Sequence, residues 1–206
     1  MFINIATENI ILYDREKSYV IPFRDVEQEL TKVCISSYKK YLPDRVYVLN
    51  GPWSFTNLRV WSLVVNILLL LSNNTCKVYT VDKLSLYRSA VREWFLPRYG
   101  YIFMGQRKNI RYYDFIEDTY TVYSTSGLHD SLSQHSQDSQ NSSFFVDLFV
   151  GEDFAEFFAW NSRMIDIVYR DEEVVLSFLW KECMITHLFS PTQKMEPYYA
   201  MEPNIW

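Results

Sequence analysis

Strand-like and helix-like segments alternate along the first half of the chain, and this order constrains the fold more than any other feature. Three short apolar runs come first, and two more runs of strand length follow between helical patterns. The expected strands are 2–6, 9–13, 18–22, 45–49 and 77–81. The expected helices are 26–41, 54–71 and a third whose first turn Asp82 is expected to cap. Strands that alternate with helices indicate an α/β protein whose partly parallel sheet is covered on its faces.

The segment 26–41 has the spacing of an amphipathic helix. Apolar residues recur in it at intervals of three and four positions. Asp25 precedes it and is a favourable N-cap residue, so we expect its carboxylate to cap the first turn. Pro43 follows it and is expected to end the helix, because proline cannot donate the next backbone hydrogen bond.

The segment 54–71 is apolar nearly all round. A helix that covers one face of a sheet needs only about a third of its surface to be apolar, so the surplus requires a second partner. Its most apolar stretch, Val60 to Leu71, is twelve residues long and is interrupted by Ser62 and Asn66. A membrane span needs about 18–20 apolar residues. We therefore expect a buried helix and no membrane association.

The strand pattern starts again after residue 96, which indicates a second lobe. Expected strands cover 99–104, 109–115, 120–123 and 144–150, with helices at 152–161 and 172–187. The stretch 124–143 is rich in Ser, Gln and Asp, and it is too polar to bury a core, so we expect a mobile loop. Residues 195–206 are expected to form an extended tail. The predicted domains are a first lobe, 1–95, and a second lobe, 96–206, each opening with a strand meander as in a duplicated fold.

Composition excludes some classes of function. The formal net charge is −5, and an acidic chain is not an autonomous nucleic-acid binder, because phosphate contact needs clustered Lys and Arg. The three cysteines, Cys34, Cys76 and Cys183, lie far apart. They predict neither a disulfide framework nor metal-ligand pairs, which fits a reducing cytosol. Charged residues close to the N-terminus indicate that no secretory signal peptide is present.

The strongest local motif lies between an expected strand and the long helix. Residues 50–60 read Asn-Gly-Pro-Trp-Ser-Phe-Thr-Asn-Leu-Arg-Val. This segment resembles the hallmark Gly-Pro-Gly-Ser-Phe-Thr-Gly-Leu-Arg of the TsaB (YeaZ) family and keeps seven of its nine positions. The positions kept are Gly51, Pro52, Ser54, Phe55, Thr56, Leu58 and Arg59. Segments 81–86, 149–152 and 197–199 are similar to further family features.

The resemblance implies a fold and a role. TsaB proteins have a duplicated actin-like (ribonuclease H-like) α/β fold with two lobes. They are non-catalytic partners of TsaD, which makes threonylcarbamoyladenosine on tRNA, while TsaE supplies an ATPase. The resemblance therefore implies a cytoplasmic, cofactor-free subunit that binds a TsaD-like protein and forms a homodimer when alone. It would meet the TsaE-like ATPase and tRNA only through the complex.

Departures from the motif bear on nucleotide chemistry. Trp53 and Asn57 stand where the family has glycines, and Trp53 would block the close approach of backbone amides to a phosphate. Ala6 stands where the family has Asp, which serves the metal–nucleotide site in catalytic relatives. We therefore expect no catalytic residues, no metal and no cofactor. Ser54 and Thr56 are expected to cap the long helix rather than to react.

Helices 26–41 and 54–71 are the predicted partner interface. The resemblance implies that they pack against like helices of a TsaD-like protein or a second copy, as in a four-helix bundle. The predicted interface residues are Leu30, Val33, Ser37, Tyr41, Phe55, Arg59, Leu63, Ile67 and Leu71. The predicted motif loop consists of Gly51, Pro52, Ser54 and Thr56.

Several alternatives remain open from the sequence alone. Both helices could simply be core. The chain could be a homodimeric structural relic of the fold, or a glycoprotease-like or kinase-like enzyme of the same superfamily. Arg59 could bind an anion, pair with an acid across an interface or lie along the surface. Asp114, Glu117 and Asp118 could do acid–base work, although a solvated turn is the simpler interpretation.

Overall fold

The computed structural model describes residues 1–6, 9–51, 55–73, 75–103, 109–124, 144–147 and 164–196. The chain divides into two compact units. The first unit comprises Met1–Leu86, Val168–Val175 and Met184–Trp206, and the second comprises Tyr87–Ile167 and Leu176–Cys183. The chain therefore returns to the first unit after forming most of the second.

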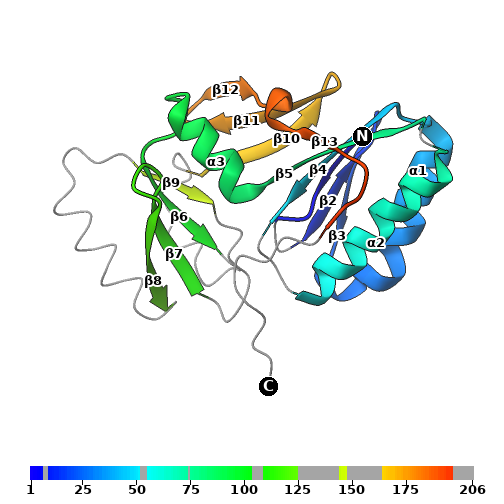
Figure 1. The fold of residues 1–206 in the computed structure, drawn as a ribbon, viewed down its shortest axis with the longest axis horizontal. Coiled ribbons are helices and arrows are strands. Elements are labelled where there is room, and N and C mark those ends of the chain that lie inside the picture. The colour runs from blue at the N-terminus through cyan, green and yellow to red at the C-terminus, as the bar shows by residue number, and fades with distance from the viewer. Residues whose placement is uncertain are drawn as a thin grey trace. The chain divides into compact units, whose positions relative to one another are not determined.

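A six-stranded sheet forms the centre of the first unit (Figure 1). Its strands are β1 (Phe2–Asn4), β2 (Ile10–Tyr13), β3 (Ser18–Ile21), β4 (Arg45–Asn50), β5 (Lys77–Asp82) and β13 (Ser190–Thr192). They lie in the order β13-β5-β4-β1-β2-β3. β1, β2 and β3 form an antiparallel meander, β1, β4 and β5 are parallel, and β13 is antiparallel to β5. The predicted meander and mixed α/β order are confirmed.

Two helical segments lie side by side against this sheet (Figure 1). The first begins as a 3-10 turn, Phe23–Asp25, passes through a π-helical turn, Val26–Leu30, and continues as α1, Thr31–Tyr41. The second is α2, Phe55–Leu71. α1 ends at Leu42, which has φ 42° and donates its N–H to the Tyr38 carbonyl just before Pro43. Both predicted helices and the stop before Pro43 are confirmed.

The predicted cap at Asp25 is wrong. The Asp25 side chain makes no capping hydrogen bond, and its backbone has φ −103° and ψ 0° rather than the extended conformation of an N-cap. The physical reason is the preceding 3-10 turn, in which the Asp25 N–H already bonds to the Pro22 carbonyl. Asp82 behaves as predicted, because its Oδ1 accepts the Ser85 N–H at 2.9 Å at the start of α3 (Lys83–Arg92).

A four-stranded sheet forms the centre of the second unit. Its strands are β6 (Tyr99–Phe103), β7 (Asn109–Asp114), β8 (Thr119–Ser124) and β9 (Phe144–Asp147), in the order β8-β7-β6-β9. β6, β7 and β8 are antiparallel, and β9 is parallel to β6. Tyr87, Phe115 and Phe145 pack together in its core, with ring centroids 5.3 to 6.3 Å apart.

The predicted helix 172–187 is wrong. That stretch forms β11 (Glu173–Phe178), β12 (Lys181–Met184) and a 3-10 turn, Thr186–Leu188, and β10 (Asp166–Arg170) completes a sheet in the order β10-β11-β12. Two-residue connections, Asp171-Glu172 and Leu179-Trp180, join these strands with positive φ at all four positions. A short apolar run can be a buried strand or a helix, and here strand pairing decides between them.

Most of the predicted loop 124–143, the predicted helix 152–161 and residues 197–206 of the predicted tail lie outside the described residues. None of the three cysteines forms a disulfide. Within the ranges that the structure describes, no helix is both long and apolar enough to cross a membrane.

Candidate functional site

The parallel strands β1, β4 and β5 end together at one edge of the first sheet, and the motif glycine lies at this edge. The carboxyl ends of parallel strands are where α/β proteins usually place their sites. Gly51 follows β4 directly, and a Cβ added to it would lie only 2.5 Å from the Ala6 Cβ. Packing within this chain therefore requires glycine at position 51, because no larger residue fits against Ala6.

Buried polar side chains fix this edge. The Asn4 Oδ1 accepts the Ala6 N–H at 3.0 Å, and the Asn50 Oδ1 accepts the Gly51 N–H at 3.0 Å. Lys83, only 3% exposed, donates from its Nζ to the Ala6 carbonyl at 2.8 Å. Asn4, Asn50 and Lys83 were not among the predicted site residues, although a polar residue at the end of a buried strand or directly after it was a usable signal. Pro52, Ser54 and the side chain of Thr56, all predicted for this loop, lie outside the described part of the chain.

An apolar stripe runs along α2, which we call the α2 stripe. It consists of Val60, Leu63, Ile67, Leu70 and Leu71, at helical intervals of three and four. Leu63, Leu70 and Leu71 are 61%, 76% and 53% exposed. The opposite side of the helix holds the buried residues Trp61, Val64, Val65 and Leu68. One side of α2 therefore supplies the core, while the other offers leucines to solvent.

The predicted interface residues divide between these two environments. Leu63 and Leu71 are exposed, Arg59 is exposed near the start of α2, and Ile67 is half-buried. Val33 and Tyr41 on α1 are also half-buried. Leu30 and Ser37 lie inside the first unit, and the Ser37 hydroxyl donates to Asp14 at 3.2 Å. The side chain of Phe55 lies outside the described residues.

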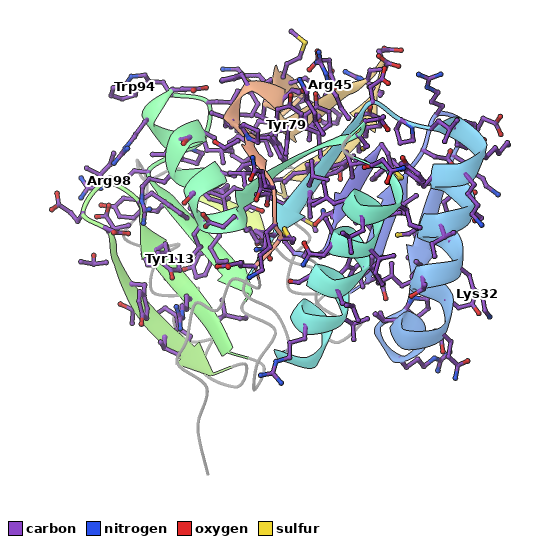
Figure 2. The ribbon with its side chains drawn as sticks, turned by 45° about the vertical axis from the view of Figure 1, so that its right-hand side comes forward. Lys32, Arg45, Tyr79, Trp94, Arg98 and Tyr113 are labelled. Carbon is purple, nitrogen blue, oxygen red and sulfur yellow. The ribbon has the colours of Figure 1, made fainter. Side chains whose placement is uncertain are left out.

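The outer side of α1 is polar. Lys32 projects away from the sheet (Figure 2) and forms an ion pair with Glu29 at 3.0 Å. Ser36, Lys39 and Lys40 are exposed on the same helix. Among the described side chains of this helix pair, the strongly exposed apolar residues therefore lie on α2 and none lies within α1.

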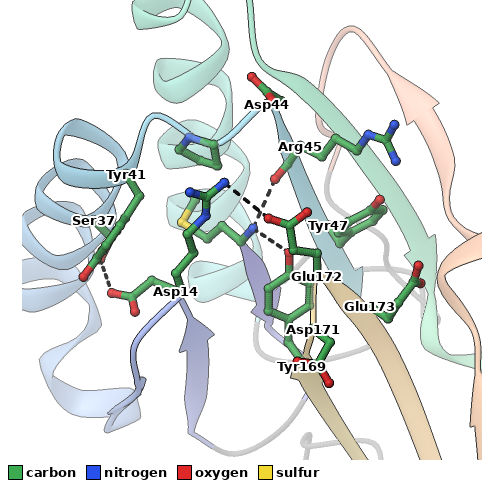
Figure 3. Close-up of a pocket in the computed structure, with 13 residues that line it drawn as sticks. Asp14, Ser37, Tyr41, Asp44, Arg45, Tyr47, Tyr169, Asp171, Glu172 and Glu173 are labelled. Carbon is green, nitrogen blue, oxygen red and sulfur yellow. Dashed lines mark hydrogen bonds and ion pairs between the residues drawn. The ribbon is translucent and has the colours of Figure 1, made fainter.

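A polar pocket of about 320 Å³ lies at the amino ends of β1 and β4 (Figure 3). Five carboxyl groups, Arg15, Arg45 and the Met1 ammonium line it. Arg15 pairs with Glu172 at 3.2 Å, and the Met1 ammonium donates to the Arg45 carbonyl and the Tyr169 hydroxyl. Burial lowers the pKa of the Met1 ammonium to about 6. The Arg15–Glu172 pair and the hydrogen bonds of the Met1 ammonium join the amino ends of β1 and β4 to residues 169–172, which is the chemistry of a structural junction.

The acidic cluster in the second unit is paired with arginines. Arg98, labelled in Figure 2, donates from Nε to Asp114 at 2.8 Å and lies 3.4 Å from Glu117. Arg88 pairs with Asp118. The hydrogen bond from Arg98 is the main reason that the pKa of Asp114 is lowered. A carboxylate held ionised in this way is a poor proton carrier near neutral pH, and the solvated-turn interpretation accounts for the cluster. Among the described residues, no group of three His, Cys, Asp or Glu side chains could hold a metal ion.

Comparisons with known proteins give distant likenesses. No family model matches the sequence, and no curated protein matches it. A solved structure of YeaZ from Pseudomonas aeruginosa is 18% identical, with a TM-score of 0.36, and the match covers 60% of this chain and 63% of that one. A second structure, of an uncharacterized protein with similarity to peptidase YEAZ from Pseudomonas aeruginosa, is 18% identical with a TM-score of 0.35, over 60% and 62% of the chains. The chain thus spans less than two thirds of either protein, and TM-scores this low do not establish a shared fold.

Proposed function

We propose that this chain is a non-catalytic, TsaB-like subunit that binds a TsaD-like protein through the α2 stripe. Its role would be to support the formation of threonylcarbamoyladenosine on tRNA. In this proposal the TsaE-like ATPase and tRNA meet the chain only through the complex, and the chain works in the cytoplasm. The motif around Gly51 suggests the family, and the exposed leucines of α2 suggest how the chain acts.

Strand order supports the proposed duplicated actin-like fold. In the first unit, β3-β2-β1-β4 is an antiparallel meander with a fourth strand parallel to the first. In the second unit, β8-β7-β6-β9 repeats this arrangement strand for strand. The two meanders fall within the proposed lobes 1–95 and 96–206. A shared order with a parallel fourth strand is a specific topology, which favours two copies of one ancestral unit.

The observation that carries the functional proposal is the exposure of Leu63, Leu70 and Leu71. Their exposed fractions amount to roughly two whole leucine side chains. Burying a leucine contributes about 1.5–3 kcal/mol, so a partner that covers these residues gains about 3–6 kcal/mol. That gain suits the apolar centre of a protein–protein interface, with neighbouring polar residues such as Arg59 at its rim.

The test is a binding measurement with the TsaD-like protein of the same organism. We expect the wild-type chain to bind and Leu63→Asp to weaken binding by about a hundredfold or more, because docking would bury an unpaired carboxylate. Val20→Asp is the matched control: Val20 is 59% exposed but lies on β3, away from α2 in sequence and element. It should bind like the wild type.

Two results would contradict the proposal in different ways. Leu63→Asp binding as tightly as the wild type would show that the α2 stripe is not the docking surface. The second result is a wild-type chain that does not bind the TsaD-like protein but forms a homodimer that Leu63→Asp disrupts. This result would favour the homodimeric relic. Mass measurement of the chain alone and with the TsaD-like protein separates these outcomes.

A further inference from the structure

Strand β8 is an unusual edge strand. Among the described strands it pairs only with β7, so it ends the four-stranded sheet of the second unit. Residues 119–122 are exposed on both faces of the sheet, and Tyr120 and Val122 are each 50% exposed. Natural proteins usually protect such an edge with charges, proline or a bulge, because an unprotected edge is a template for another strand.

The sequence of β8 carries none of these protections. It reads Thr-Tyr-Thr-Val-Tyr-Ser, six residues without charge, glycine or proline. β-branched and aromatic residues are those that favour strands. Such a composition at an exposed edge is suited to pairing with a further strand.

Tyr120 is held in place before any partner arrives. The Arg111 guanidinium lies 4.3 Å from the centre of its ring, and the Tyr113 ring centroid is 5.1 Å away. Arg111 is itself buried and donates to the Tyr113 hydroxyl at 3.0 Å. A side chain already fixed by cation–π and aromatic contacts loses little freedom on docking.

The strand is also complementary to itself. When a two-fold axis relates two antiparallel edge strands, it stands perpendicular to the sheet, so each residue pairs with one that points to the same face. If the axis lies midway between the two copies of Thr121, these two residues face each other. Tyr120 then pairs with Val122, and Thr119 pairs with Tyr123. Thr–Thr pairs and aromatic–β-branched pairs are among those that stabilise antiparallel sheets. An axis through Tyr120 would instead place Asp118 against Val122.

We propose that β8 is a self-association edge, on which a second copy of this chain pairs antiparallel about Thr121. The two four-stranded sheets become one continuous eight-stranded sheet in a closed, two-fold dimer. This surface lies in the second unit and does not include the α2 stripe, so the inference goes beyond the proposed function.

The symmetry allows a sharp test with charges at one position. Thr121→Arg and Thr121→Glu each place like charges opposite each other at the axis, which should weaken dimerisation by about tenfold or more. Mixing the two variants places opposite charges there, which should restore a mixed dimer. Sedimentation velocity and native mass spectrometry of the full chain give both readouts. Val20→Arg, on the edge strand β3 of the other sheet, is the matched control and should dimerise like the wild type.

The outcomes decide the inference. Recovery of a mixed dimer supports it, and a misfolded variant could not give that recovery. A monomeric wild type, a Thr121→Arg variant that dimerises normally, or a mixture that fails to recover would each overturn it. Leu63→Asp should leave β8 pairing unchanged, so a failure of the α2 proposal can be told apart from a failure of this one.

Discussion

Removing the Asp14 carboxylate should destabilise the first unit substantially. Asp14 is buried at the turn between β2 and β3. It accepts the Glu16 N–H at 2.8 Å, the Lys17 N–H at 3.0 Å and the Ser37 hydroxyl at 3.2 Å (Figure 3 shows the last of these). It therefore closes the β2–β3 turn and links that turn to α1.

The expected cost of Asp14→Ala follows from these three contacts. Glu16 and Lys17 are exposed, so water replaces the acceptor for their amides and each loss is modest. Ser37 is buried, and a buried donor left without an acceptor costs about 1–3 kcal/mol. The sum is about 2–4 kcal/mol of unfolding free energy, a large share of the 5–15 kcal/mol typical of a domain.

The effect should depend on pH with a definite sign. Burial by itself would raise the pKa of Asp14, but hydrogen bonds, first among them those from the Lys17 and Glu16 amides, outweigh it, and the pKa is lowered. Because the folded pKa lies below the unfolded value of about 3.9, the stabilisation is complete above that value. It is lost as pH falls through the folded pKa. The difference in stability between wild type and Asp14→Ala should therefore shrink toward pH 3.

Urea unfolding at pH 7 and at lower pH measures this difference. Ser37→Ala removes only the hydroxyl contact and should cost about 1 kcal/mol. Asp14→Asn keeps a neutral acceptor and should fall between wild type and Asp14→Ala at pH 7. An Asp14→Ala variant within about 0.5 kcal/mol of the wild type, the scatter of ordinary surface substitutions, would refute the reasoning. A destabilisation that does not change with pH would refute the role given to the charge.

Three further substitutions test the packing. Gly51→Ala should cost more than Gly100→Ala, because the new Cβ at Gly51 would lie 2.9 Å from the Ala6 Cα and must displace backbone, whereas at Gly100 it meets only the Phe145 ring, 2.5 Å away. Thermal unfolding should show that each substitution lowers the unfolding free energy by about 1–3 kcal/mol or more. Equal stabilities of the two variants would contradict the ranking. Asn66→Ala removes two hydrogen bonds to the Met195 backbone, at 2.8 and 3.1 Å, so limited proteolysis should cut near residue 195 faster than in the wild type. Unchanged cleavage there would show that Asn66 is not what holds this segment.

Periodicity and local chemistry made much of the first unit predictable. The meander, the helices 26–41 and 54–71 and the cap at Asp82 follow from residue spacing, and the structure confirms them. These features depend on interactions between residues close in sequence, so a single segment holds the information. The Gly51 motif likewise indicated a turn between a strand and a helix, although its packing reason, contact with Ala6, is not visible in the sequence.

Contacts between segments distant in sequence decided which side of each helix is exposed to solvent and available to a partner. α2 is apolar nearly all round, so its sequence cannot say that Trp61 faces the core while Leu63 faces solvent. Ser37 was predicted for the interface but bonds to Asp14, 23 residues earlier. Burial is a property of what packs against a residue, and that partner comes from elsewhere in the chain.

The sequence by itself determined that strands and helices alternate and where most of them begin and end, because hydrophobic period and turn residues act locally. Only the tertiary structure decided that 173–178 and 181–184 are strands, since an apolar run suits a helix equally well until neighbours supply its backbone partners. The tertiary structure likewise placed β13 beside β5, more than a hundred residues away, and left β8 at the edge of its sheet. Strand pairing joins backbone groups that are far apart along the chain, so the local pattern does not contain it.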